Sequence, residues 1–164
     1  MSQRSAIVVV AVGVLAAAFV FFEPWTLGTS TTVNEAPPSV ADSTGQATPP
    51  EPRELASGRF VGQEHETTGR ARVIELPDGD RVLRLEDFAT SNGPDLHVWL
   101  SVKKAGGGWF KYGTGRAVKL GALKANRGSH NYAIPDDADL DGLNSVVIWC
   151  KRFFVAFGSA PLDL

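Results

Sequence analysis

The fold class is decided by residues 70–85, which read RARVIELPDGDRVLRL from Arg70 to Leu85. Two runs rich in aliphatic and β-branched side chains, 70–76 and 81–85, flank a short turn. The turn contains Asp78-Gly79, a pair that readily supplies the positive φ angles of a hairpin. The sequence therefore predicts a β-hairpin at this point.

Similar short runs continue toward the carboxyl terminus. Leu96 to Leu100 and Ser145 to Cys150 are apolar at neighbouring as well as alternate positions, which is typical of strands near the centre of a sheet. Phe153 to Phe157 is expected to form the last strand. No segment of helical length shows a sustained period of 3.6 residues. Residues 58–164 are thus predicted to be all-β, as a sandwich or small barrel of about eight strands.

The first 27 residues have the pattern of a transmembrane signal anchor. Residues 6–22 carry no charge, and with the following turns to Leu27 the stretch approaches the ~30 Å hydrocarbon core of a bilayer. Arg4 precedes the stretch, whereas acidic residues follow it, so the amino terminus is expected in the cytoplasm. We expect a single-pass membrane protein that contacts the membrane through Ala6 to Leu27 and carries its β domain outside the cytoplasm.

A cleaved signal peptide is the competing interpretation of this segment. The small residues Ala16 to Ala18 lie inside the apolar run and are followed by Phe19 to Phe22, so cleavage there would leave an apolar new terminus. Trp25 has the character of an interfacial anchor. The uncleaved anchor is therefore favoured.

Residues 28–57 are rich in Thr, Ser, Pro, Ala and Glu. Such a composition offers too little apolar surface to form a core of its own. The sequence predicts a disordered linker that holds the β domain off the membrane.

Composition excludes several classes of function. The 164 residues suffice for one domain and a tail, and a net charge of −2 gives no general attraction to nucleic acid. A single cysteine, Cys150, excludes an internal disulfide and a two-cysteine redox pair. Signature motifs of hydrolases, kinases and metalloproteases are absent, so enzymatic activity stays an open question.

The order of several short motifs resembles the DM-thirteen (DM13) domain family. These motifs are Gly58-Arg59-Phe60, His65-Glu66-Thr67-Thr68-Gly69, Leu85-Glu86-Asp87-Phe88, Asn92-Gly93-Pro94-Asp95-Leu96, Leu120-Gly121-Ala122-Leu123-Lys124, Asn131-Tyr132-Ala133-Ile134-Pro135, Asn144 to Phe153, and Phe157-Gly158-Ser159-Ala160. Each motif is short, and the ordered series is specific.

The resemblance implies an extracytoplasmic β-rich module of an electron-transfer system. The partner, a redox or envelope protein, stays unknown. The resemblance also implies that the characteristic cysteine acts as a bare thiol or through a prosthetic group such as haem. In this sequence it assigns Cys150 the catalytic and cofactor-binding position. His65 is a second cofactor-binding candidate because histidine is a possible axial ligand of haem. The cofactor itself stays unknown.

Residue spacing also supports a different interpretation of Cys150. Its side chain should share a face with Val146 and Ile148, two apolar residues of the same run, and free cysteines are often buried. Lys151 and Arg152 could instead lower the pKa of the thiol. The alternative function is a non-catalytic cell-envelope binding module with a structural cysteine, whose partner meets the basic stretch from Lys103 to Arg127.

The possible metal ligands of the chain form no recognisable site. His65, His97, His130 and Cys150 form no short ligand pair, so no metal site is expected, and His97 is interpreted as a structural histidine. The acidic run 136–141 is interpreted as a solvated turn. A lone exposed cysteine could also link two copies of the chain by a disulfide.

Overall fold

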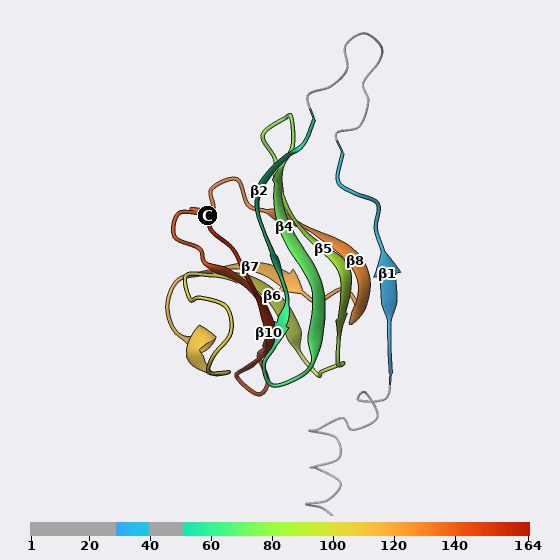
Figure 1. The fold of residues 1–164 in the computed structure, drawn as a ribbon, viewed down its shortest axis with the longest axis vertical. Coiled ribbons are helices and arrows are strands. Elements are labelled where there is room, and N and C mark those ends of the chain that lie inside the picture. The colour runs from blue at the N-terminus through green and yellow to red at the C-terminus, as the bar shows by residue number, and fades with distance from the viewer. Residues whose placement is uncertain (1–28, 40–50) are drawn as a thin grey trace, which may run out of the picture.

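The computed structural model of the protein describes residues 29–39 and 51–164. In this part of the chain, ten β-strands form two five-stranded sheets that pack face to face (Figure 1). The predicted all-β sandwich is therefore confirmed, with ten strands in place of about eight.

The strand order of each sheet defines the topology. The first sheet runs β1 (Thr32–Asn34), β8 (Arg127–Ile134), β5 (Arg81–Thr90), β4 (Thr67–Glu75) and β2 (Arg53–Arg59). The second runs β3 (Val61–Gly62), β10 (Val155–Pro161), β9 (Ser145–Cys150), β6 (Leu96–Ser101) and β7 (Ala117–Ala122). All described pairings are antiparallel except the parallel pair β1–β8.

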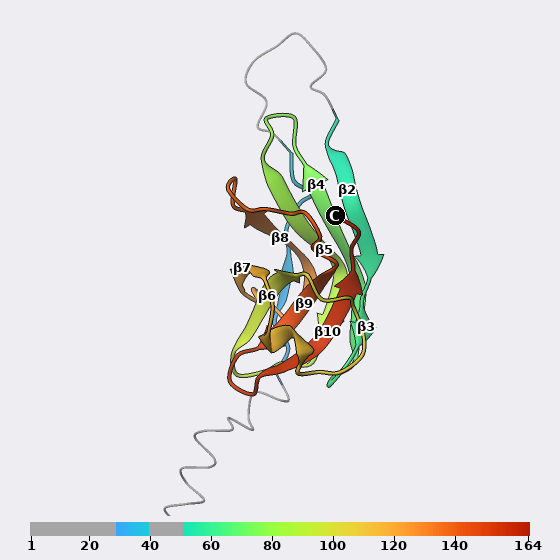
Figure 2. The ribbon, with the colours of Figure 1, turned by 90° about the vertical axis from the view of Figure 1, so that its left-hand side faces the viewer.

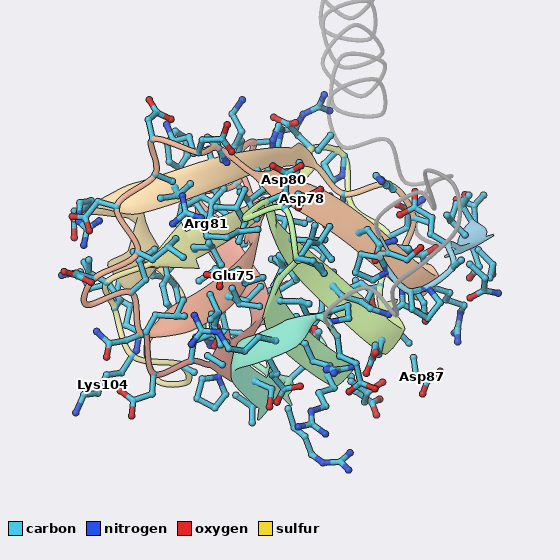
Figure 3. The ribbon with its side chains drawn as sticks, turned by 90° about the horizontal axis from the view of Figure 1, so that it is seen from above. Glu75, Asp78, Asp80, Arg81, Asp87 and Lys104 are labelled. Carbon is cyan, nitrogen blue, oxygen red and sulfur yellow. The ribbon has the colours of Figure 1, made fainter. Side chains whose placement is uncertain are left out.

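The predicted hairpin is confirmed as β4 and β5, with Glu75 paired to Arg81. Gly79 adopts a φ of 93°, and the amide of Leu76 donates to the carbonyl of Asp80 over 2.8 Å. Figure 3 looks down on the sandwich from above and labels Asp78 and Asp80 at this turn. The turn marks one end of the sandwich, and the loops before β4 and after β5 mark the other.

The main core fills the space between the sheets. The first sheet contributes Ala71, Val73, Leu83, Leu85 and Tyr132, and the second contributes Val98, Leu100, Val146, Ile148, Cys150 and Phe157. Burial on the inner faces follows the alternation of side chains along each strand.

A second apolar cluster covers the outer face of the second sheet. It contains Trp99, Tyr112, Val147, Trp149 and Ala156. The loop 102–116, with the 3-10 helix η2 (Lys111–Gly113), supplies Tyr112 and crosses this face in Figure 2. All six residues of β9 are consequently buried, which confirms its predicted central position.

Irregularities in β4 and β5 coincide with two of the sequence motifs, residues 65–69 and 85–88. The register shifts between Thr68 and Arg70 and between Leu85 and Phe88. Gly69 has a φ of 110°, and Asp87 a φ of 47°. A Cβ on Gly69 would lie 2.7 Å from the carbonyl oxygen of Glu86, so only glycine fits at this position.

The structure differs from the sequence prediction at both ends of the expected linker 28–57. Thr32–Asn34 forms the edge strand β1, and Arg53–Arg59 forms β2, so the predicted domain boundary at Gly58 falls inside a strand. Residues 40–50 of the linker lie outside the described residues.

Polar contacts, and not apolar burial, hold β1 in place. The carboxylate of Glu35 accepts hydrogen bonds from Lys124 Nζ at 2.7 Å and from the amide of Asn131 at 2.6 Å. Arg84 donates to the carbonyls of Glu35 and Ala36. A polar composition therefore did not prevent this segment from joining the sheet.

The last strand is displaced along the chain from its predicted position. It begins at Val155 and not at Phe153, because residues 151–154 form the β9–β10 turn.

Within 29–39 and 51–164, none of the helices has the length and apolar character needed to cross a membrane. The predicted anchor 1–27 lies outside the described residues.

We expect Gly69→Ala to lower the free energy of unfolding by about 2–4 kcal/mol, because it combines backbone strain with a steric clash. Gly79→Ala is the matched control. Gly79 also has a positive φ, but a Cβ there meets nothing within 4 Å, so the cost should be only about 1–2 kcal/mol. Urea unfolding of the full chain, followed by tryptophan fluorescence, measures both values. Equal losses of unfolding free energy in the two variants would show that the close approach of Glu86 to Gly69 adds no cost.

Glu35→Gln should loosen β1, because it removes the charge that Lys124 pairs with. The hydrogen bond from Lys124 holds the pKa of Glu35 below its ordinary value of 4.5. Its stabilisation is therefore present above pH 4.5 and is lost as the pH falls through the lowered pKa.

Hydrogen-exchange mass spectrometry of the β1 and β8 amides tests this expectation. Protection should be lower in Glu35→Gln than in the wild type at neutral pH, and the two should converge in acid. Glu75→Gln, which removes an ion pair at the opposite edge of the sheet, should leave these amides unchanged. Unaltered protection in Glu35→Gln would show that backbone pairing alone holds β1.

Candidate functional site at the Cys150 end of the sandwich

The end of the sandwich opposite the β4–β5 turn gathers most of the sequence motifs. Strand register places Leu96, at the start of β6, opposite Cys150, at the end of β9, and Cys150 opposite Val155, at the start of β10. The β3–β4 and β5–β6 loops lie at the same end (Figures 1 and 2). We call this the Cys150 end.

Cys150 points into the main core. Its side chain packs in the cluster that contains Val146 and Ile148, as the strand spacing predicted, and it is 0 % exposed. Burial raises the pKa of the thiol, while backbone hydrogen bonds from Phe153, Arg152 and Asp95 act in the opposite direction. The thiolate is therefore disfavoured, which is the reverse of the lowering that neighbouring basic residues could have caused.

The turn 151–154 closes over this end of β9. The amide of Lys151 donates to the carbonyl of Asp95 at 2.9 Å, which ties the turn to the β5–β6 loop. Asp95 also holds His97, with 2.7 Å between Oδ1 and Nε2. Of the two situations expected for a structural His97, solvent-facing or hydrogen-bonded, the structure shows the hydrogen bond. The role of Asp95 could not be predicted, because no sequence pattern shows that its backbone carbonyl accepts a hydrogen bond from the distant amide of Lys151.

His65 lies on the β3–β4 loop, beside β10. Its ring stacks at a tilt on Phe157, with 4.0 Å between the centroids, and its amide donates to the carbonyl of Phe157. Nε2 lies 2.5 Å from Oε2 of Glu64, an ion-pair contact without the alignment of a hydrogen bond. These contacts fix the ring at the surface.

An apolar cavity of about 280 Å³ opens next to His65. Its apolar lining comes from Pro94, Trp109, Phe110, Phe153, Val155 and Phe157, and its polar lining from His65, Glu64 and Asn92. Phe153 and Phe157 thus contribute aromatic rings to this cavity. Trp99 and Trp149, in contrast, stack on each other at 5.2 Å on the far face of the second sheet.

The structure does not bring the two predicted site residues into one cavity. His65 lines the cavity, which we call the His65 cavity, whereas Cys150 does not line it. The two are neighbours through Val155, which faces the cavity and is the cross-strand partner of Cys150. A ligand in the cavity would thus contact His65 directly. It would be separated from Cys150 by core residues such as Val155.

The third histidine, His130, is enclosed by the fold. His130 is 0 % exposed, its Nε2 lies 3.0 Å from the carbonyl of Arg127, and burial lowers its pKa. Among the described residues, no three His, Cys, Asp or Glu side chains gather in a way that could hold a metal ion.

The basic stretch from Lys103 to Arg127 is partly neutralised. Arg116 pairs with Asp139 of the acidic run at 3.2 Å, and Lys124 pairs with Glu35. Lys119 lies over the ring of Trp99, with Nζ 5.4 Å from the centroid. Ion pairs thus neutralise two of the seven basic residues of the stretch.

The burial of Cys150 predicts slow chemical modification. We expect a maleimide to label the folded wild-type chain at pH 8 at least ~100-fold more slowly than the chain in denaturant, because the sulfur is enclosed and its thiolate is disfavoured. Mass spectrometry of quenched samples gives the rates. Comparable rates in the two states would mean that the β9–β10 turn opens readily in solution.

The sandwich resembles a known protein family. Residues 59–162 match the model of the family described as electron transfer DM13. Neither a curated protein nor a solved structure matches the chain. Because the family model spans nearly the whole sandwich, from the end of β2 past the end of β10, the chain belongs to the electron transfer DM13 family.

Proposed function

We propose that this chain is an electron-transfer module held at the outer side of a membrane by the segment Ala6 to Leu27, with the Cys150 end as its functional end. Membership of the electron transfer DM13 family carries the redox part of the proposal. The uncharged run 6–22 and the charge asymmetry around it support the anchor and the extracytoplasmic placement.

Cys150 is the proposed redox group, as the only cysteine of the chain. Its enclosure in the core sets a condition on the chemistry. Exchange with a thiol or disulfide of a partner protein requires contact with the sulfur, so the turn 151–154 would have to open first. The same condition applies to a disulfide between two copies of the chain, which stays a prediction for a nonreducing gel of native membranes.

A haem held by both candidate residues does not fit this geometry. A haem needs an axial ligand that faces an apolar space, and Cys150 faces the packed core. His65 does face an apolar cavity, but 280 Å³ lies just below the ~300–1,000 Å³ range of ordinary ligand pockets. The proposal therefore assigns no step to a haem.

The second candidate function is a non-catalytic envelope-binding module in which Cys150 only packs. One observation favours it specifically: the thiol is 0 % exposed, and burial raises its pKa. Reactive cysteines are generally found in partly exposed, electropositive surroundings. The two candidates differ in whether removal of the sulfur changes the redox behaviour of the protein.

Protein-film voltammetry of the full chain, purified from membranes, separates the two candidates. We expect a redox wave in the wild type, in which the Cys150 thiols of two chains lose two electrons and two protons to the electrode and form one disulfide. Cys150→Ala should abolish this wave. Val146→Ala is the matched control, because it removes a buried side chain from the same face of β9 and leaves the sulfur in place. Each variant should lose about 1–3 kcal/mol of stability, so both must first be shown to be folded at the temperature used.

A wave that disappears only in Cys150→Ala supports a redox function through this cysteine. A wave that is identical in all three proteins would contradict the role of Cys150 and leave the redox role to another group. The absence of a wave from the wild type would favour the binding module.

A further inference from the structure

We propose that the Cys150 end of the sandwich rests on the membrane surface, with Trp109, Phe110 and Phe154 in the interfacial layer. The proposal rests on the membrane anchor of the proposed function. It goes beyond that function because it assigns the domain an orientation and the exposed aromatic side chains a lipid partner.

The first observation is the exposure of these side chains. Trp109 is 45 % exposed, Phe110 65 % and Phe154 67 %, and among the described residues only Val61 is another exposed large hydrophobic. Trp109 and Phe110 border the His65 cavity, and the carbonyl of Trp109 accepts from the amide of Ala156, two residues after Phe154. The three side chains therefore belong to one end of the molecule.

The backbone of Phe154 supplies a second observation. Its φ is 57°, a left-handed conformation that is unfavourable for a bulky side chain. A strained residue usually gains packing in return, but Phe154 is largely exposed. Glycine or asparagine would suit this turn better, so an aromatic side chain here is explained by a contact outside the domain.

The position of the tether is the third observation. The Oγ1 atom of Thr29 accepts a hydrogen bond from Nδ2 of Asn92 at 2.9 Å, and Asn92 lines the His65 cavity. Thr29 is only two residues beyond Leu27, the predicted end of the anchor. Two residues span at most ~7 Å, so the anchor must end close to the mouth of the cavity.

The docking of β1 prevents the tether from acting as a long spacer. β1 begins at the Cys150 end, as Figures 1 and 2 show, and its pairing with β8 fixes the direction in which the chain enters the domain. The opposite end, with the β4–β5 turn, then faces away from the membrane. This orientation places the exposed aromatics, and not the charged turn at Asp78 and Asp80, toward the lipid.

Lipid is favoured over a protein partner because the tether fixes where this end lies. Tryptophan and other aromatics are well suited to the boundary between head groups and acyl chains. Charge has a smaller part, because the basic Lys151 and Arg152 of the turn 151–154 are accompanied by Glu64 and Glu66 on the neighbouring β3–β4 loop. We therefore expect the contact to depend on the aromatic side chains more than on anionic head groups.

Spin-label measurements on the full chain test this orientation. The chain is reconstituted into vesicles of phosphatidylethanolamine and phosphatidylglycerol, with labels on the variants Phe110→Cys and Phe154→Cys. Asp78→Cys at the opposite end and Val12→Cys in the anchor are the controls, and unsubstituted chain reports any labelling of Cys150. The ratio of collision rates with oxygen and with a nickel chelate reports the depth of each label.

We expect the ratio to be several-fold higher at residues 110 and 154 than at residue 78, and highest at residue 12, because oxygen concentrates in the apolar layer. A high ratio at residue 12 with water-like ratios at 110 and 154 would overturn the orientation and leave the anchor standing. Water-like ratios at all four sites would overturn the anchor and the orientation together.

A label-free measurement guards against disturbance by the substitutions. Brominated lipids should quench a larger fraction of the tryptophan fluorescence in the wild type than in Trp109→Phe, and Trp25 contributes equally to both. Phe154→Gly should remain folded and gain stability, because it relieves the strained φ, yet it should reduce the quenching of Trp109. Quenching that is unchanged in both variants would contradict the proposed contact.

Discussion

The burial of β9 on both of its faces is the constraint on which the rest of the structure depends. Its inner face, with Ile148 and Cys150, closes the core of the sandwich, and its outer face, with Val147 and Trp149, is covered by the loop that carries Tyr112. Because that loop must reach across the second sheet, its Trp109 comes to lie against β10, beside the His65 cavity. One doubly buried strand therefore positions both the cysteine and the aromatic rim.

The elements that could be predicted from the sequence are those whose cause is local. The β4–β5 hairpin follows from Asp78-Gly79, and β9 follows from a continuous apolar run. β1 could not be predicted, because Glu35 is held by Lys124, 89 positions away in the chain. The division of the aromatics between two clusters likewise depends on which face of the sheet the loop 102–116 covers, and no pattern within the loop specifies that.

The candidate site shows a similar limit. Strand spacing correctly placed Cys150 on the face of Val146 and Ile148, and the ordered motifs were sufficient to recognise the family. The relation of Cys150 to His65 could not be predicted, since it depends on a cross-strand neighbour, Val155, that separates the sulfur from the cavity. Family motifs thus indicated which residues matter, whereas only the packing shows which of them a ligand can reach.

The place of Cys150 in the strand order has a consequence for the time course of folding. Both β9 and β10 come late in the chain, and two pairings join segments more than ninety residues apart, Val33 with Gly128 and Gly62 with Gly158. Topologies with such distant pairings fold slowly. In the exported form proposed above, the thiol would be open to oxidation until the last strands assemble. The native core therefore encloses the cysteine only late in folding.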